Sequence, residues 1–455
     1  MHARIGSDRR ETICAIASGT GGGIGIVRLS GPEAEAIGRR LVASLAVGLE
    51  SHRLVHGLAR DPDSGEPLDE VLACVMRAPR SYTGETVVEL HGHGGAANLE
   101  RLLDAAMRAG ARVADPGEFT RRAFLAGRMD LTRAEAVAEV IAARSSRAVR
   151  LAQAQLRGEV SAKISSLRER LVALLAEVEA RVDFPDERLD FVPGPVLAAS
   201  LVALADEAAS LAATQARGRL ITEGMDVALV GRTNAGKSSL LNALAGEERA
   251  LVDAAPGTTR DFVEVEVEIA GVRVKLVDTA GERDAVEDVE RRGLELGRRR
   301  GRRADVVLVV VDGQLGFGEV EARLVSEASD GVSVLVAWNK ADLQPAVGGV
   351  PAGVPVVATS ALAGLGLDSL RAALALVIGG VAEDEVLITS ARQRDALDQA
   401  VESLRAGAAL LAADQPPELA AVDLRLALDR LGRITGDSVD DAVLDAIFAR
   451  FCIGK

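Results

Sequence analysis

Residues 226 to 239 read DVALVGRTNAGKSS, and this stretch decides the fold of the middle of the chain. A short apolar strand runs directly into GRTNAGKS at Gly231 to Ser238, which fits the pattern GxxxxGK followed by Ser or Thr. Glycine there lets backbone N–H groups turn inward around phosphate oxygens at a helix N-terminus. Lys237 reaches the β and γ phosphates, and the Ser238 hydroxyl ligates magnesium. The stretch predicts a P-loop that binds a nucleoside triphosphate.

Two downstream segments supply the other groups that magnesium and the γ-phosphate need. Asp278-Thr279-Ala280-Gly281 ends the apolar strand VRVKLVD, where a carboxylate helps to hold the magnesium shell and Gly281 meets the γ-phosphate. Between this segment and the P-loop lies PGTTRD at Pro256 to Asp261, whose Thr259 is a second magnesium ligand. Such a loop becomes ordered when the γ-phosphate is present. These are the two predicted switch regions.

The choice of base follows from Asn339-Lys340-Ala341-Asp342, which comes after the strand SVLVAW. The Asp342 carboxylate accepts two hydrogen bonds from the N1–H and the exocyclic amine of guanine, and adenine cannot form that pair. A site built around such bonds rejects an analogue that lacks them by roughly 10⁴-fold or more. Thr359-Ser360-Ala361 completes the base pocket from its other side. The three motifs, in this order and spacing, predict a guanine-nucleotide site.

The pattern of strands and helices predicts a multidomain chain. Residues 225 to 378 alternate strand-like and helical runs, which is typical of a mostly parallel α/β sheet. Residues 1 to about 120 mix the β-rich runs TICAIA, GIGIVRLS, EVLACVM and TVVELHG with one helical stretch, NLERLLDAAMRAG, and this mixture favours an α+β domain. Both regions therefore carry a sheet.

Helical patterns lie on both sides of the α/β region. Apolar residues recur every three or four positions between about 122 and 183 and predict one long helix, about 60 Å if forty residues take part; they are Leu156, Val160, Ile164, Leu167, Leu171, Leu174, Val178 and Val182. A second pattern leads to residue 218, and the chain is helical again after 388. We expect the two helical blocks to pack together, with the α/β unit inserted between them.

Composition limits the remaining possibilities. A chain of 455 residues suggests about three domains, and its formal net charge of −14 means that any nucleic acid must be held by a local basic patch. Cys14, Cys74 and Cys452 form no CxxC pair, which argues against a disulfide framework or zinc site and favours a reducing, cytoplasmic setting. No signal peptide and no apolar run near 20 residues is found, so we expect no membrane span.

Motifs outside the α/β unit resemble one family, the tRNA-modification GTPases known as MnmE or TrmE. They cover the whole chain and are more specific than the P-loop: GGxGIxRLSG at Gly22 to Gly31, TGE and VELHGHGG between Thr83 and Gly95, PGEFTRRAFLxGRMDL at Pro116 to Leu131, DFPDE at Asp183 to Glu187, and FCIGK at Phe451 to Lys455. Generic GTPases lack these flanking motifs. The alternative is a regulatory or ribosome-assembly GTPase that shares only the G domain.

The resemblance implies four segments and a function. The segments are a tetrahydrofolate-binding and dimerisation domain at 1–121, a helical domain at 122–215, an inserted Ras-like GTPase domain at 216–378, and the second part of the helical domain at 379–455. Such proteins act as homodimers on the wobble uridine (U34) of certain tRNAs. With the FAD-dependent flavoprotein MnmG or GidA, in a heterotetramer or larger complex, they install an aminomethyl or carboxymethylaminomethyl group at C5.

The resemblance also implies ligand sites. The one-carbon donor is 5-formyl- or methylene-tetrahydrofolate, and the matching folate positions are Arg28, Glu89, Arg128 and Lys455. The three cations suit the folate carboxylates, and Glu89 suits the pterin N–H donors. A thiol role for Cys452 in the tRNA chemistry stays open beside the simpler interpretation that FCIGK packs the terminus so that Lys455 reaches the folate pocket.

The family uses K⁺ in place of an arginine finger. The matching K⁺ positions are Asn234, Asp253, Ala255 and Thr258, and those for Mg²⁺ are Ser238 and Thr259. Asp253 stands where Thr is common, which leaves its effect on cation preference open. The positions expected to contact GTP are Asn234, Ala235, Gly236, Lys237, Ser238, Ser239, Asp253, Ala254, Ala255, Pro256, Gly257, Thr258, Thr259, Asp278, Thr279, Ala280, Gly281, Asn339, Lys340, Asp342, Ser360 and Ala361.

The family's catalytic acid, which orients the attacking water, falls on Glu290. Glu282 directly follows the DTAG segment and is a rival for that role, although an ionised carboxylate only accepts hydrogen bonds. The arginine cluster between Arg298 and Arg303 either contacts tRNA phosphates or complements a helix dipole. The sequence leaves both questions open.

Overall fold

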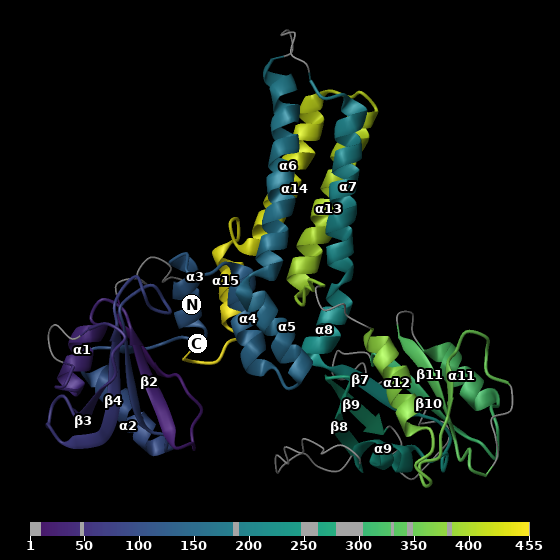
Figure 1. Cartoon of the computed structure of the whole chain (residues 1–455), viewed down its shortest axis with the longest axis horizontal. Coiled ribbons are helices and arrows are strands. Elements are labelled where there is room, and N and C mark those ends of the chain that lie inside the picture. Colours follow the sequence, from purple (N-terminus) through teal and green to yellow (C-terminus); the bar gives the residue numbers. More distant parts are fainter. Residues whose placement is uncertain are drawn as a thin grey trace. The chain divides into compact units, whose positions relative to one another are not determined.

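The computed structural model describes residues 11–45, 50–184, 191–246, 263–278, 304–328, 332–343, 349–379 and 385–454. The chain divides into two compact units (Figure 1). The first contains Met1–Ala138, Leu156–Glu169 and Leu428–Lys455, and the second contains Glu139–Gln155 and Arg170–Ala427. Each unit carries its own sheet, so the predicted multidomain class, with α+β and α/β parts and helices, is confirmed.

The first unit is built around a six-stranded sheet in the order β3-β4-β5-β2-β1-β6. The four predicted β-rich runs form β1, β2, β4 and β5, whereas the sequence patterns did not indicate β3, β6 or the first helix. Every pairing is antiparallel except that of β1 with β6. The strands are β1 (Ile13–Ile16), β2 (Ile24–Ser30), β3 (Val55–Arg60), β4 (Pro67–Met76), β5 (Val87–His93) and β6 (Arg112–Val113).

Helices α1 (Ala34–Leu41) and α2 (Ala96–Arg108) pack on one face of this sheet. Strand β2 explains how the sheet makes a core, since its residues alternate between two faces. Val27 and Leu29 are fully buried in the cluster that also holds Leu99 and Leu102 of α2, while Arg28 points to the opposite face. That second face carries the polar residues of interest.

The C-terminus of the chain belongs to the same unit as its N-terminal sheet. Helices α3 (Glu118–Leu125), α4 (Leu131–Ala142) and α15 (Asp441–Phe448) share a small apolar cluster that includes Leu131, Leu444, Phe448 and Phe451. The Phe448 ring lies 5.4 Å from that of Phe451 and 6.4 Å from that of Phe124, between centroids. Aromatic stacking thus fixes the end of the chain on this unit.

The predicted long helix between 122 and 183 is wrong. The region forms α3, α4, α5 (Ser146–Arg157) and α6 (Glu159–Asp183), and the 25 residues of α6 span about 37 Å instead of 60 Å. Gly158 separates α5 from α6 with a φ of +95°, a conformation that L residues avoid and that breaks the helix. Val160, Ile164, Leu167, Leu171 and Val178 are nevertheless fully buried, so the predicted apolar face of α6 is confirmed.

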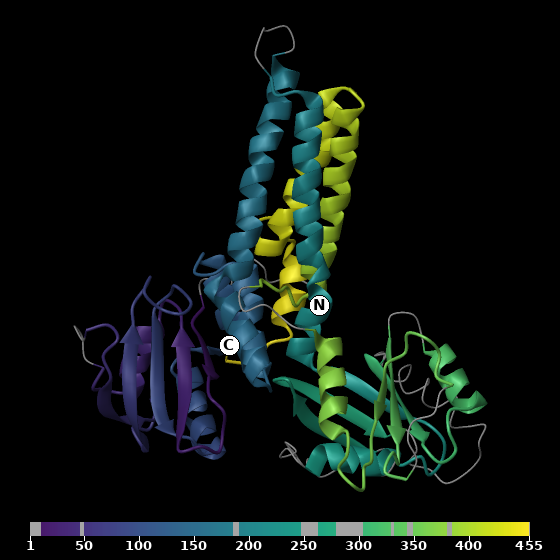
Figure 2. The same cartoon turned by 45° about the vertical axis from the view of Figure 1, so that its right-hand side comes forward.

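Helices from both sides of the central α/β region lie side by side (Figures 1 and 2). They are α6, α7 (Gly194–Ala213), α13 (Ala391–Ala412) and α14 (Pro417–Thr435), with α8 (Gln215–Glu223) continuing from α7. Ion pairs join Arg405 to Asp206 and Arg425 to Glu179 across them. The helical segments that flank the α/β region therefore pack on one another.

One stretch of the described chain, Gly194–Glu223, is long and apolar enough by composition to cross a membrane, since a window of 18 residues within it has a mean hydropathy of 1.6. In the structure its α7 part packs against α13. Leu197, Leu201, Leu204 and Leu211 are buried in this packing. Helix-on-helix packing thus accounts for these four leucines.

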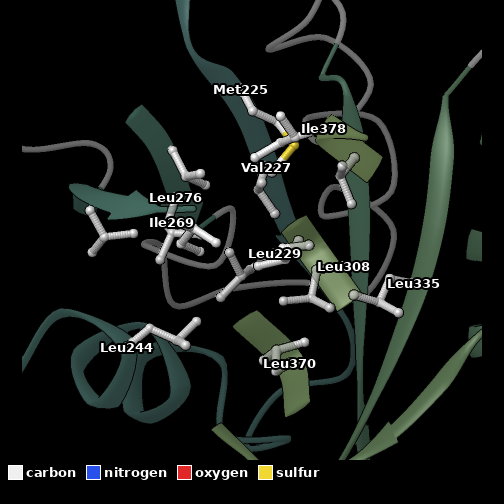
Figure 3. Close-up of a cluster of buried hydrophobic side chains, with 14 of the residues drawn as sticks. Met225, Val227, Leu229, Leu244, Ile269, Leu276, Leu308, Leu335, Leu370 and Ile378 are labelled. Atoms are coloured by element: carbon white, nitrogen blue, oxygen red, sulfur yellow. The ribbon is translucent and has the colours of Figure 1, made fainter. Parts of the chain in front are cut away.

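The second unit carries the α/β sheet, in the order β12-β11-β10-β7-β9-β8. All neighbours are parallel except β8 and β9, which form an antiparallel hairpin. Figure 3 shows that Val227, Leu229, Leu276 and Leu308 from its strands belong to one core cluster with Leu370 and Ile378 of helix α12 (Leu367–Ile378). The elements are β7 (Met225–Val230), β8 (Val263–Ile269), β9 (Val272–Asp278), β10 (Val306–Asp312), β11 (Ser333–Asn339), β12 (Val356–Ala358), α9 (Lys237–Gly246), α11 (Glu319–Glu327) and α12 (Leu367–Ile378).

Candidate nucleotide site

The P-loop connects β7 to α9, and neither of its two glycines leaves room for a Cβ atom. Gly231 has a φ of +145°, and a Cβ there would lie 2.3 Å from the Val310 carbonyl oxygen of β10. Gly236 has a φ of +93°, and a Cβ there would lie 2.2 Å from the Asn339 side-chain nitrogen. Contacts this short exclude any side chain. The loop therefore packs closely against β10 and β11.

Lys237 is the first residue of α9 and is 5% exposed. Its Nζ donates hydrogen bonds to the carbonyl oxygens of Gly231 and Arg232, both at 2.8 Å, so the side chain curves back over the loop. Burial lowers the pKa of Lys237, and the nearby Asp278 carboxylate partly opposes that shift. A phosphate on this loop would therefore meet an ammonium that is already desolvated.

Ser238 and Asp278 lie together, as a shared magnesium requires. The Ser238 Oγ donates to the Asp278 Oδ2 at 2.5 Å, and Asp278 is 3% exposed at the end of β9. The register that pairs Leu229 with Asp278 places this carboxylate beside the start of the P-loop. A hydroxyl and a carboxylate are hard oxygen ligands that suit Mg²⁺. The two residues fit that ion.

The guanine motifs meet the P-loop through Asn339, which ends β11 and is 2% exposed. Its Nδ2 donates to the Ala235 carbonyl oxygen at 2.9 Å, and its Oδ1 accepts from the Ala361 N–H at 3.1 Å. The Ala341 N–H donates to the Thr359 carbonyl oxygen at 2.9 Å. One side chain thus holds the phosphate loop and both base loops in register, while Asp342 stays exposed.

Asp312, at the end of β10, was not predicted as a site residue. Its Oδ2 accepts a hydrogen bond from the Lys340 Nζ at 2.6 Å, and Lys340 itself has a φ of +61°. Burial would raise the pKa of Asp312, but hydrogen bonds from Lys340 and from the Gln314 N–H outweigh burial and hold that pKa below its ordinary value. The ionised carboxylate thus holds the ammonium end of Lys340 in place. The sequence did offer one indication of Asp312, since it is the polar residue that directly follows the apolar run VVLVVV.

Glu321 of α11 is a second residue that the sequence did not indicate. Its carboxylate is 1% exposed and pairs with Arg232 of the P-loop, with Nε and Oε1 2.8 Å apart and Nη2 donating to Oε2 at 3.0 Å. The Gly318 N–H also donates to Glu321 Oε2 at 3.0 Å. This ion pair ties the outer side of the P-loop to α11.

Replacing Glu321 by Gln is expected to lower the free energy of unfolding of this unit by about 2 kcal/mol. The amide keeps an oxygen for Gly318 but loses the charge opposite Arg232, which is one-third exposed and so limits the loss. The chain has one tryptophan, Trp338, and it is 1% exposed within this sheet. Its fluorescence during urea unfolding measures the effect. Glu319→Gln, two residues earlier on the same helix and exposed, should stay within about 0.5 kcal/mol.

Several predicted site residues lie outside the described residues. They are Asp253, Ala254, Ala255, Pro256, Gly257, Thr258, Thr259, Thr279, Ala280, Gly281, Glu282, Glu290, the arginines from Arg298 to Arg303, and Lys455. The described chain therefore brings together the P-loop, the Ser238–Asp278 pair and the guanine motifs. The switch and catalytic assignments stay predictions.

The predicted folate positions Arg28 and Glu89 face each other across β2 and β5. The Arg28 Nε donates to the Glu89 Oε1 at 2.8 Å, and the Glu89 Oε2 lies 3.0 Å from His91 Nε2. The Arg28 guanidinium carbon is 5.7 Å and 5.8 Å from the ring centroids of Tyr82 and Phe119. The Arg28 and Glu89 side chains are only 16% and 15% exposed. The charged pair is therefore largely shielded from solvent and lies beside aromatic rings.

The other two predicted folate positions are Arg128 and Lys455, and the described residues show less of their surroundings. Arg128 is exposed after α3. Gly454, with a φ of +97°, lies so near β1 that a Cβ would be 2.2 Å from the Ile16 carbonyl oxygen. Because Ile16 pairs with Val27, the chain end approaches the strand that carries Arg28. The FCIGK motif is thus packed on the N-terminal sheet.

The three cysteines are free thiols. Cys14 and Cys74 are buried, and burial raises the pKa of Cys14 to about 12 despite the nearby Arg112, which makes that thiol inert. Cys452 is exposed. Within the described part of the chain, no group of three or more His, Cys, Asp and Glu side chains is placed to hold a metal ion.

Comparison with known proteins gives consistent matches over the chain. A family model for the MnmE helical domain matches residues 131–452, and one for the N-terminus of the GTP-binding protein TrmE matches residues 12–128. The tRNA modification GTPase MnmE of Synechococcus sp. (strain RCC307) is 44% identical over 453 residues, covering 98% of this chain and 99% of that protein. The protein of the same name from Moorella thermoacetica is 45% identical over 465 residues, with the same coverage.

Among solved structures, the G domain of the T. maritima FeoB iron transporter is 28% identical, with a TM-score of 0.26, and covers 34% of this chain and 98% of that one. The full-length matches and both family models agree with the motifs at the two ends of the chain. This chain belongs to the MnmE family of tRNA modification GTPases.

Proposed function

We propose that this chain is the GTP-hydrolysing component of the system that modifies C5 of the tRNA wobble uridine. The observation that supports the GTPase part best is Asn339, which holds the phosphate loop to both guanine loops. The tRNA part rests on the relatives, which are named tRNA modification GTPases. The proposed setting is the cytoplasm, and the proposed segments are those at 1–121, 122–215, 216–378 and 379–455.

The nucleotide chemistry assigns roles to particular residues. Lys237 and the P-loop N–H groups hold the phosphates, and Asp342 reads the base. Ser238 and Thr259 hold Mg²⁺, which supplies charge stabilisation when bound. Asn234, Asp253, Ala255 and Thr258 are the proposed K⁺ ligands. Glu290 orients the attacking water.

The folate proposal is supported by the Arg28–Glu89 pair. A tetrahydrofolate offers carboxylates and a ring with N–H donors, and these match a cation and a carboxylate set side by side near aromatic rings. The folate supplies the one-carbon unit when bound. Arg128 and Lys455 would complete the site, and a homodimer works with the flavoprotein partner. Reconstitution tests this: omitting GTP, folate or the flavoprotein should each stop the C5 modification of tRNA.

GTP hydrolysis is expected to be at least about tenfold faster in KCl than in NaCl at equal ionic strength and Mg²⁺, because a fixed cation between phosphates acts like an arginine finger. Release of phosphate measures the rate. Asn234 has a φ of +66°, which Gly adopts without strain, so Asn234→Gly removes the proposed ligand alone and should abolish the difference. Equal rates of the unchanged protein in both salts would contradict the K⁺ assignment.

A further inference from the structure

The N-terminal half of α5 carries an unusual arrangement of charge. The segment from 144 to 158 reads RSSRAVRLAQAQLRG, with four arginines and no acidic residue, in a chain whose net charge is −14. Three of them, Arg144, Arg147 and Arg150, lie at or just before the first turns of the helix. The positive end of the helix dipole is there, so cations are unfavourable and acids are preferred. Helix stability does not explain this arrangement.

Helix α5 has a buried face and an exposed face (its place in the fold is shown in Figure 1). Ala148, Ala152 and Gln155 are buried on one face. At 3.6 residues per turn, Arg150 lies on the opposite face, and both Arg150 and Arg144 are exposed. Among the described residues, neither Arg144 nor Arg150 forms an ion pair. Two guanidinium groups therefore face solvent without a neutralising carboxylate.

Arg147 is held differently from its two neighbours. Its backbone N–H donates to the Gly271 carbonyl oxygen at 3.2 Å. Its side-chain Nη2 donates to the Gly379 carbonyl oxygen at 3.3 Å. Burial lowers the pKa of Arg147, and the charges of Arg150 and Arg217 lower it further. The cations at this site thus repel one another, which is the property of a surface that attracts an anion.

Two carboxylates among the described residues lie beside this surface. Glu268 of β8 has its Oε1 3.4 Å from the Ser146 Oγ, and Glu385 pairs with Arg217 at a neighbouring position. Glu385 is neutralised by Arg217, so the contacts of the described residues set Arg144, Arg147 and Arg150 against one carboxylate, Glu268. The described part of this surface therefore carries more positive than negative charge.

We infer that Arg144 and Arg150 at the N-terminal end of α5 bind backbone phosphates of tRNA. This inference rests on the proposed function, which makes tRNA the substrate, and it names the surface that the substrate contacts. An acidic protein needs a local basic patch to hold a polyanion, and guanidinium groups bind phosphate oxygens in a fork geometry. Contacts of this kind position the RNA without reading its sequence.

The surface is also joined to the nucleotide site. The Arg147 N–H and the Ser146 Oγ contact the turn and the Glu268 side chain of the β8–β9 hairpin. The other end of that hairpin is Asp278, which bonds to Ser238. One hairpin therefore spans from the proposed phosphate-binding end of α5 to the magnesium ligands.

The test is the salt dependence of tRNA binding by the full-length protein, measured by fluorescence anisotropy of labelled tRNA. The double variant Arg144→Gln/Arg150→Gln should lower affinity about tenfold at low salt and reduce the slope of log Kd against log salt by about two. Arg144→Lys/Arg150→Lys keeps both charges and should keep the slope. GTP hydrolysis and Trp338 fluorescence should not change in either variant.

The matched control is Arg394→Gln/Arg405→Gln on α13, which removes the same charge from arginines that are similarly exposed but paired with Asp398 and Asp206. It should leave the slope unchanged. An unchanged slope in the α5 variant, or an equal loss in the control, would overturn the inference. If the unchanged protein itself fails to bind tRNA, the proposed function is wrong, and the two failures are thereby distinguished.

Discussion

Asp342→Asn is expected to weaken GTP binding by about 10⁴-fold, because the site loses the charged acceptor for the guanine N1–H and amine. The structure holds the Asp342 loop in place through Ala341, whose N–H bonds to the Thr359 carbonyl oxygen. The substitution should therefore remove the contact of the Asp342 side chain with the base and leave the conformation of the loop unchanged. Xanthosine triphosphate carries a carbonyl where guanine has its amine, so the new amide can donate to it, and the variant should prefer this nucleotide. Titration calorimetry measures both affinities.

The control for this variant is Asp368→Asn. Asp368 lies at the start of α12 with its side chain 99% exposed, so the charge change is the same but no base contact is involved. It should bind GTP as the unchanged protein does. Equal affinities of Asp342→Asn and the unchanged protein for GTP would remove the guanine assignment.

Glu290→Ala is expected to lower the rate of GTP hydrolysis by about 10³-fold and to leave GTP affinity unchanged. A residue that orients the attacking water acts in the transition state, so kcat falls while binding is kept. Rates in KCl under saturating GTP measure the first quantity, and equilibrium titration measures the second. Because Glu290 lies outside the described residues, this experiment is the test of its predicted catalytic role.

Glu282 supplies the competing assignment. Glu282→Ala should change the rate by less than about tenfold if Glu290 is the catalytic acid, and the pair of variants should reverse if Glu282 has that role. A large fall in both rates would mean that the two carboxylates act together, against the single-residue account given above.

The nucleotide site could be predicted because its motifs end strands of one parallel sheet. Gly231 follows β7, whereas Asp278 and Asn339 are the last residues of β9 and β11, and the carboxyl ends of parallel strands meet at one edge. Spacing in the sequence therefore corresponds to proximity in space. The α+β character of the first region followed from its alternating runs in the same direct way.

Pairings between distant residues could not be predicted in this way. Glu321 meets Arg232 through a helix 89 residues further along, and neither residue has a local pattern that marks it. Asp312 was missed although it ends an apolar strand, because its role depends on Lys340, which follows the neighbouring strand β11. The pairing of Arg28 with Glu89 depends on the register between β2 and β5, which cannot be read from the sequence.

The length of α6 was wrong for a local reason. The apolar repeat continues through Leu156 and Val160, and periodicity alone does not register that Gly158 adopts a positive φ between them. From Val160 onward the predicted buried face was nonetheless correct at five of seven positions, and Leu174 and Val182 are partly buried, because core packing keeps nearly the same spacing after the break. Periodicity reports the buried face of a helix more faithfully than its ends.

The central claim, that this chain drives modification of the tRNA wobble uridine, is tested most directly by mass spectrometry of that nucleoside. The tRNA is taken from cells that lack the chain and from the same cells that express it or its Asp342→Asn variant. The account predicts that the C5 group is lost without the chain, returns with the unchanged protein, and does not return with the variant. A C5 modification that persists at its normal level without the chain would contradict it.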